Sequence, residues 1–386
     1  MEYRLEDIFD LQMGKTPARD NPEYWDSENH KWISIADLSK CGKYIEETKE
    51  YISDKAVDES GISQIPANTV VMSFKLSIGK TAITPEPMYS NEAIMSFRDK
   101  KIVELLPDYI YYMFSGKNWD EGTNKAVMGK TLNKATLSKI KVNIHSLDEQ
   151  KRIIEILDKV SSVISDRQAV LKKMDDLIKA RFVELFGVPD VNSMCWEEKQ
   201  LSAYLDVVGG YAFKSDLFLD EGIPVLRIGN INAGYFKPIN MVYWEEDNTL
   251  ERYKMYPGDL VMSLTGTVGK DDYGNVCILG NDYNEYYLNQ RNAKLELKQG
   301  LNKYYLSHLL KFEQIKKRLT GISRGVRQAN ISNKDIMNLC VPIPPIELQE
   351  QFADFVAQVD KSKVAVQKAL EESQLLFDSL IQEYFG

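Results

Sequence analysis

The chain consists of two halves that carry the same landmarks in the same order. Residues 5–14 (LEDIFDLQMG) match residues 201–210 (LSAYLDVVGG), with leucine, aspartate and glycine in register. Four further matches follow: residues 33–37 with 226–230, Val71-Met72-Ser73 before Gly79-Lys80 with Val261-Met262-Ser263 before Gly269-Lys270, Tyr109-Ile110 with Tyr305-Leu306, and Leu132-Asn133 with Ile331-Ser332. Five ordered matches indicate a tandem duplication, so the fold must contain one architecture twice.

Each half begins with a globular part made of short β-type runs. Residues 69–72 and 259–262 are such runs, and glycine, proline and asparagine punctuate the sequence around them. Helical patterns follow at residues 105–114 and 302–319. This succession predicts two tandem domains of mixed α/β (α+β) structure.

Each half ends in a long amphipathic pattern, which predicts two long helices. Ser146 and Glu149 have the spacing of a capping box at the first start, Gly187 follows the first end, and Pro344-Pro345 precedes the second helix. The apolar seams continue for more than five heptads, which favours a coiled-coil spacer over two ordinary core helices. Polar residues interrupt these seams at Arg167, Arg181, Lys363 and Ser373.

Composition restricts the class of protein. The 386 residues, 44% of them hydrophobic, suffice for two domains, and neither a signal peptide nor a membrane span is evident. Four cysteines without a CxxC pair favour a cytoplasmic protein with reduced thiols and no metal site. The net charge of −9 by itself disfavours a nucleic acid as partner, but residues 311–334 hold seven basic residues against the single acid Glu313 and offer one basic face.

Several motifs stand at defined places in these halves. Gly14-Lys15-Thr16-Pro17 precedes residues 21–25 (NPEYW), residues 256–263 read YPGDLVMS before Gly266 and Gly269, and residues 341–351 read VPIPPIELQEQ. In this order they resemble the DNA specificity subunit family of Type I restriction–modification enzymes. The matching junction of the first half, residues 142–150 (VNIHSLDEQ), differs because it lacks the prolines. The resemblance covers essentially the whole chain.

This resemblance implies a division of labour along the chain and with other proteins. Residues 1–145 and 188–344 would be two target recognition domains, each reading half of a bipartite site in double-stranded DNA. Residues 146–187 and 345–386 would be the conserved helices, which would form an antiparallel coiled coil. The chain would assemble with two methyltransferase subunits and, for cleavage, with motor-nuclease subunits. Catalysis, S-adenosylmethionine and ATP would belong to those partners, so this chain would be non-catalytic and hold no cofactor.

Three regions are candidates for DNA contact, because arginine and glutamine read guanine and adenine while lysine mainly holds phosphate. The first is the loop at 321–328 and its counterpart at 124–130, with Arg324, Arg327, Gln328, Lys125 and Lys130. The second comprises the turn residues Lys75, Lys80, Thr265, Thr267 and Lys270. The third comprises the loops after Gly14 and Gly210, with Lys15, Arg19, Tyr211 and Lys214.

Two other classes of protein have to be weighed. A scaffold could join protein partners through the same coil without reading DNA, although the basic segment at 311–334 favours DNA. A self-sufficient methyltransferase is suggested only by Asn21-Pro22-Glu23-Tyr24, which is similar to motifs that hold a flipped adenine. No glycine-rich cofactor segment of the FxGxG type accompanies it.

Overall fold

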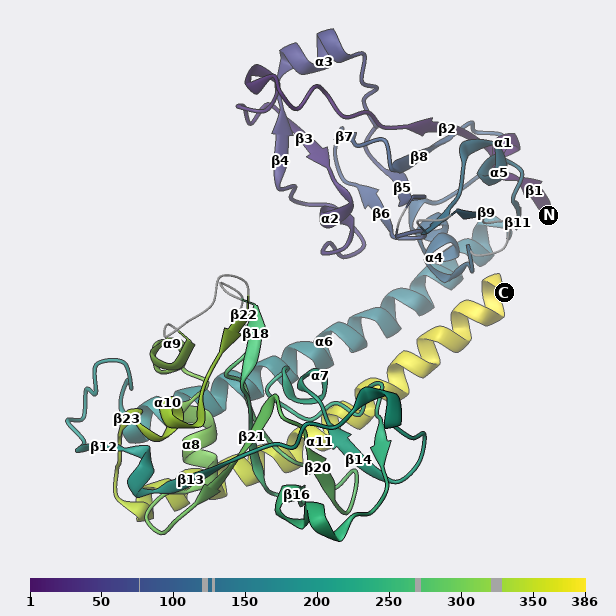
Figure 1. The fold of residues 1–386 in the computed structure, drawn as a ribbon. Helices are drawn as coiled ribbons and strands as arrows, with labels where there is room; N and C mark the ends of the chain where they lie inside the picture. Colours follow the sequence, from purple (N-terminus) through teal and green to yellow (C-terminus); the bar gives the residue numbers. More distant parts are fainter. Residues whose placement is uncertain (76, 120–123, 127–128, 268–271, 321–327) are drawn as a thin grey trace. The chain divides into compact units, whose positions relative to one another are not determined.

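The computed structural model describes the backbone of the chain except for residues 76, 120–123, 127–128, 268–271 and 321–327, and it describes no side chains at 120–131 or 321–328. Two compact units result, Met1–Ala169 with Gln367–Gly386 (unit 1) and Val170–Val366 (unit 2). Helices α6 (Leu147–Phe186) and α11 (Ile346–Phe385) each have 40 residues and contribute to both units (Figure 1). Each unit therefore contains one end of both long helices.

Unit 1 is organised around a four-stranded antiparallel sheet with the strand order β2-β8-β5-β6. A second sheet has the order β4-β3-β7, and two separate strand pairs are β1-β11 and β9-β10. The strands are β1 (Glu2–Arg4), β2 (Phe9–Met13), β3 (His30–Ile33), β4 (Glu50–Ile52), β5 (Thr69–Ser73), β6 (Thr81–Thr84), β7 (Tyr89–Ser90), β8 (Ile94–Asp99), β9 (Asn124–Ala126), β10 (Gly129–Thr131) and β11 (Lys141–Asn143). The shorter helices are α1 (Leu5–Ile8), α2 (Ile35–Leu38), α3 (Asp54–Ser60), α4 (Pro107–Gly116) and α5 (Lys134–Ser138), with the 3-10 helix η1 (Pro22–Tyr24).

Unit 2 repeats the main sheet in the order β13-β21-β17-β19 and the terminal strand pair as β12-β23, while its second sheet, β15-β14-β20-β16, has a fourth strand and its other pair is β18-β22. Its strands are β12 (Glu198–Gln200), β13 (Leu205–Gly209), β14 (Ile223–Leu226), β15 (Tyr243–Trp244), β16 (Lys254–Met255), β17 (Leu260–Ser263), β18 (Thr265–Thr267), β19 (Val276–Ile278), β20 (Tyr286–Leu288), β21 (Asn292–Leu297), β22 (Gln328–Asn330) and β23 (Cys340–Pro342). Its helices are α7 (Ile228–Ile231), α8 (Lys303–Leu309), α9 (Glu313–Thr320) and α10 (Asn333–Met337), with 3-10 helices η2 (Leu201–Ala203), η3 (Ser215–Leu217) and η4 (Asn248–Tyr253).

The predicted duplication is visible in the backbone contacts. Gly14 N–H donates to Ile94 O at 3.1 Å, and Gly210 N–H donates to Asn292 O at 3.2 Å. A Cβ on Gly14 would lie 2.1 Å from Ser90 O, and one on Gly210 would lie 2.1 Å from Asn289 O. Both matched positions therefore require glycine, because the chain passes directly over a neighbouring carbonyl.

One predicted helix is wrong in its extent. Residues 302–319 form two helices, α8 and α9, with a break at residues 310–312. Leu310 ends α8, and Phe312 turns its ring to within 5.0 Å of the Phe182 ring on α6. The partly buried ring of Phe312 thus packs against α6 at the point where the helix is interrupted.

The predicted ends of the long helices are confirmed. Ser146 and Glu149 form the capping box, with Glu149 N–H donating to Ser146 Oγ at 3.4 Å and Ser146 N–H donating to the Glu149 carboxylate at 3.1 Å. Gly187 follows α6 with a φ of +79°, the left-handed conformation that commonly ends a helix. Prolines 344 and 345 directly precede α11.

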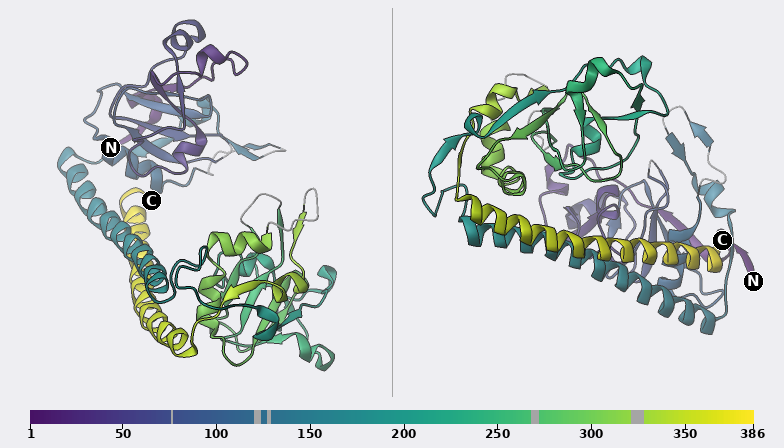
Figure 2. Two further views of the ribbon diagram at one scale, coloured as in Figure 1. Left: turned by 90° about the vertical axis from the view of Figure 1, so that its left-hand side faces the viewer. Right: turned by 90° about the horizontal axis from the view of Figure 1, so that it is seen from below.

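The two long helices pack antiparallel in both units (Figure 2). In unit 1, Arg167 on α6 donates to Ser373 Oγ and to Ala369 O on α11. In unit 2, Lys363 on α11 forms an ion pair with Asp175 on α6 at 2.5 Å. Polar residues that interrupt the seams thus meet groups of the facing helix, and the predicted fold class is confirmed.

Each globular part is joined to a long helix by a fully buried glutamine at the same position. Gln150 Oε1 accepts from Leu106 N–H at 3.1 Å, and its Nε2 donates to the carbonyls of Glu104 and His145. Gln349 Oε1 accepts from Asn302 N–H at 2.8 Å, and its Nε2 donates to the carbonyls of Gly300 and Pro344. These two glutamine clamps satisfy backbone groups where α4 and α8 begin.

Two ionisable groups also lie where a globular part meets the long helices. Lys43, on the segment between α2 and β4, forms ion pairs with Asp108 on α4 and Asp158 on α6. His308 on α8 packs edge-on against the Phe352 ring of α11, with centroids 5.3 Å apart. Burial, aided by the positive charges of Lys311 and Lys363, lowers the pKa of His308 to about 3, so the imidazole is neutral.

Candidate DNA interface

In unit 2 a row of backbone hydrogen bonds joins the three candidate regions at one edge. Tyr211 O accepts from Gln290 N–H, Arg291 O accepts from Leu264 N–H, and Leu264 O accepts from Ile331 N–H, at 2.8–2.9 Å. Next to this row β18 pairs with β22, which sets Thr267 opposite Gln328. The loop after Gly210, the turn after β17 and the end of the segment at 321–328 therefore meet.

Unit 1 carries a corresponding row, in which Lys15 N–H bonds to Ser90 O as Tyr211 N–H bonds to Leu288 O in unit 2. Ser90 O accepts from Lys15 N–H at 2.8 Å, Ala93 O accepts from Phe74 N–H at 3.0 Å, and Phe74 O accepts from Leu132 N–H at 3.2 Å. Lys75 follows Phe74 in the chain, and β10 ends just before Leu132. The strand register of β9 and β10 sets Lys125 opposite Lys130. Both units thus have an equivalent edge, where the loop after Gly14 or Gly210 meets the turn at Phe74 or Leu264 and the segment at Leu132 or Ile331. We call it the recognition edge.

Several candidate residues lie outside what the structure describes. Arg324, Arg327 and Lys270 belong to segments whose backbone is not described. Gln328, Lys125 and Lys130 are placed only as members of their strands. Their contribution to DNA binding stays a prediction.

Arg19 is engaged inside unit 1. Its guanidinium lies 3.7 Å from the centre of the Trp25 ring and 4.8 Å from that of Trp32. It also forms a two-pronged ion pair with Glu50, with N–O distances of 2.5 and 3.1 Å. These contacts use the planar face and the donors that would otherwise read a base, so Arg19 holds the loop after Gly14 in place.

The other described candidates differ in how much of their side chain is occupied. Lys15 Nζ donates to Ser60 O at 2.5 Å, and the Tyr211 ring packs against Phe213 and Tyr253. Lys80 and Lys214 are exposed. Thr265 Oγ1 is buried and has no hydrogen-bond partner within the described part of the chain.

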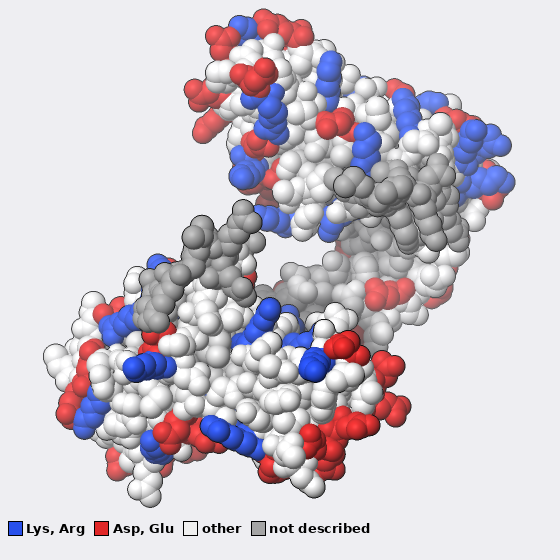
Figure 3. Space-filling view, viewed as in Figure 1, with Lys and Arg blue, Asp and Glu red and all other residues white. Residues whose placement is uncertain are grey.

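The basic segment at 311–334 is less available than its sequence suggests. Lys316 is buried and donates to Asn275 Oδ1 at 2.7 Å, while Arg318 donates to Cys340 O and Lys317 pairs with Glu313. Lysine and arginine side chains are interspersed with acidic ones on the face of each unit that Figure 3 shows. The described surface therefore attracts phosphate less than a strongly basic protein would.

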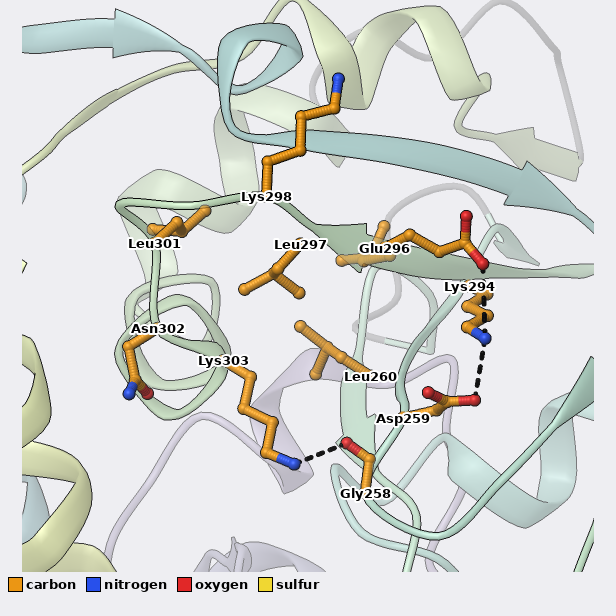
Figure 4. Close-up of a pocket in the computed structure, with 11 residues that line it drawn as sticks. Gly258, Asp259, Leu260, Lys294, Glu296, Leu297, Lys298, Leu301, Asn302 and Lys303 are labelled. Atoms are coloured by element: carbon orange, nitrogen blue, oxygen red, sulfur yellow. Dashed lines mark hydrogen bonds and ion pairs between the residues drawn. The ribbon is translucent and has the colours of Figure 1, made fainter.

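A pocket of about 500 Å³ lies at the end of β21 remote from the recognition edge. Lys294 lines it and pairs with Asp259 at 3.0 Å and Glu296 at 3.4 Å, and Lys303 donates to Gly258 O at 2.9 Å (Figure 4). The charge of Lys294 is thus balanced by two carboxylates, and the ammonium group of Lys303 is hydrogen-bonded to the turn before β17. The pocket is therefore a feature of the packing in unit 2 and offers little free charge to a ligand.

The segment that suggested a methyltransferase has a structural use. Asn21 caps η1 by accepting from Glu23 N–H at 3.1 Å, and the Glu23 carboxylate pairs with Lys55 of α3. The Tyr24 hydroxyl donates to Glu59 of α3 at 2.8 Å. Asn21, Glu23 and Tyr24 thus fasten the loop after Gly14 to α3.

Sequence reasoning missed the turn at residues 289–291. It supplies two groups of the backbone row and carries the exposed side chains of Gln290 and Arg291. The signal that could have found it is its place directly before β21, where the first half has Asn91-Glu92-Ala93 before β8.

Comparison with known proteins assigns the family. Residues 1–173 and 195–373 match the family described as the Type I restriction modification DNA specificity domain. The chain belongs to this family, with one matched region in each half, and the resemblance seen in the motifs is confirmed.

Individual relatives match most of the chain. The chain is 23% identical over 406 residues to the Type I restriction enzyme MjaIX specificity subunit of Methanocaldococcus jannaschii, covering 98% of this chain and 90% of that protein. It is 24% identical to the MjaVIII specificity subunit of the same organism, covering 76% and 73%. A solved structure of a Type I restriction–modification S subunit from M. genitalium shares the fold, with a TM-score of 0.56 at 14% identity and coverage of 100% and 96%.

Proposed function

We propose that this chain is the non-catalytic subunit that gives a Type I restriction–modification complex its DNA sequence specificity. In this proposal residues 1–145 and 188–344 each read one half of a bipartite target in double-stranded DNA. Residues 146–187 and 345–386 carry these domains. The observation that supports it best is the recognition edge, which occurs once in each unit and gathers the candidate loops in both.

Catalysis is assigned to other subunits. Two methyltransferase subunits would methylate adenine, motor-nuclease subunits would cleave, and the complex would act in the cytoplasm on chromosomal DNA. The long helices offer these partners apolar contacts, because Val163, Val170 and Leu177 on α6 are 41%, 39% and 51% exposed and recur every seven residues. Such a row fits a partner helix.

The charge of the chain also supports partners in DNA binding. At a net charge of −9, with Lys316, Lys317 and Arg318 engaged internally, much of the phosphate neutralisation has to come from other subunits. We therefore expect the isolated chain to bind DNA weakly and the assembled methyltransferase to bind it tightly.

The test is to map methylated adenines in cells that express the methyltransferase subunits with and without this chain. A bipartite motif that appears only with the chain is the expected result. A mobility-shift assay with the assembled complex separates the remaining alternative, because a scaffold that reads no DNA would give no sequence-dependent shift. Nanomolar, sequence-specific binding by the chain alone would contradict the proposed role of partners.

A further inference from the structure

We propose that Arg291 reads a guanine in the half-site bound by the second half of the chain, and that the turn at 289–291 is a specificity-determining element. The inference rests on the proposed function and names a residue for it. Arginine forms two parallel hydrogen bonds to O6 and N7 of guanine, a geometry that requires a fixed starting point for a planar donor.

The backbone of this turn is held at both ends. Gln290 N–H donates to Tyr211 O, Arg291 O accepts from Leu264 N–H and Asn292 N–H donates to Asn289 O, each at 2.9 Å. The fully buried Asn292 adds a side-chain bond from Nδ2 to Leu226 O of β14 at 2.7 Å. Arg291 therefore projects from a turn that is tied to three other segments of unit 2.

The side chain of Arg291 is exposed, and the part of the chain that the structure describes gives its guanidinium no hydrogen bond or ion pair. Two other arginines of the second half are engaged: Arg227 donates to Asn240 O, and Arg318 donates to Cys340 O. Among the described residues nothing occupies the donors of Arg291, whereas those two arginines help to hold the fold.

The surroundings of Arg291 are those of a polar contact surface. Its carbonyl bonds to Leu264, directly before β18, where the buried Thr265 Oγ1 has no partner among the described residues. Tyr211, bonded to the same turn, is 38% exposed. Two exposed side chains with polar ends, Tyr211 and Arg291, thus come from neighbouring segments at this edge.

The first half differs at the matching place. Ala93 stands where the second half has Arg291, and Glu92, in place of Gln290, accepts a hydrogen bond from Thr16 Oγ1. The backbone row is kept, but an alanine methyl group stands in place of the Arg291 guanidinium and a carboxylate in place of the Gln290 amide. The two halves therefore present different chemistry at equivalent positions, so Arg291 affects only one half-site.

The experiment uses the assembled methyltransferase with the full chain, once its target motif is mapped. Methylation rates are measured on DNA duplexes with the target and with every single base-pair change in both half-sites. Arg291→Ala is expected to slow methylation of the target by about ten- to a hundred-fold and to abolish discrimination at one G·C pair of one half-site. Arg291→Lys should keep the charge, recover part of the rate and still lose that discrimination.

Lys298→Ala is the matched control. It removes the same charge from the opposite end of β21, roughly 20 Å away along the strand, where Lys298 pairs with Asp206. Its rates should equal those of the wild type. Hydrogen exchange of β21 in each variant checks that the fold is intact.

A uniform loss across all duplexes would make Arg291 a phosphate contact and overturn the inference, and so would full retention of rate and discrimination. Failure of the proposed function looks different. In that case the wild-type complex itself would methylate no defined bipartite target, before any variant is made.

Discussion

The glutamine clamps give the sharpest test of how each globular part is held on its long helix. Gln349→Ala removes one acceptor and two donors from a fully buried site, leaving Asn302 N–H and the carbonyls of Gly300 and Pro344 without their partner. Each such bond contributes about 1 kcal/mol, and unsatisfied buried groups cost more than the bond itself. We expect unit 2 to lose about 3 kcal/mol of unfolding free energy.

A loss of that size lowers the melting temperature of a domain of 150–250 residues by roughly 6–12 °C. Gln349→Glu keeps the size and one acceptor but sets a second acceptor against two carbonyls, so it should also destabilise unit 2. Gln367→Ala is the control, since Gln367 on the same helix is exposed and donates to Glu371.

Hydrogen exchange measured by mass spectrometry locates the effect, which a melting curve alone cannot do when two units unfold separately. Gln349→Ala should raise exchange at the start of α8, and Gln150→Ala should raise it at the start of α4. If both variants behave like Gln367→Ala, the clamps do not stabilise these junctions and the reasoning is refuted.

Three further outcomes are expected. Lys43→Met should lower the free energy of unfolding of unit 1 by about 1–2 kcal/mol, because it leaves Asp108 and Asp158 facing each other. Lys55→Met removes a lysine from an exposed pair and should change thermal unfolding little; equal effects of the two variants would contradict this. The folded pKa of His308, about 3, lies below its unfolded value, so the folded state disfavours the protonated imidazole. The contribution of His308 to stability is therefore complete above pH ~6.5 and falls as the pH drops, by about 1–2 kcal/mol at pH 5. In pH-resolved denaturation, His308→Gln should remove this dependence. Arg19→Ala should lower the stability of unit 1 by about 1 kcal/mol and leave the recognised bases unchanged in methylation assays; a changed motif would show that Arg19 reads DNA after all.

The sequence alone determined the features that local chemistry encodes. The duplication, the buried strands at β5 and β17, and the two long helices with their starts and ends were all predicted. They follow from hydrophobic periodicity, capping residues and glycines required by close approach, and each of these signals is carried by residues near one another in the chain. The family followed from the same landmarks.

The tertiary structure decided which polar side chains are occupied. Arg19 looked available in sequence, but Glu50, 31 residues away, and two tryptophans engage it. Gln349 belonged to a recognised motif, yet its use depends on Asn302, 47 residues away. The turn at 289–291 escaped notice because its place beside Leu264 and Tyr211 exists only in the folded chain. Periodicity and capping depend on residues near one another in the chain, so the sequence predicted the architecture. Whether a side chain such as that of Arg291 is available depends on long-range contacts, which only the folded chain shows.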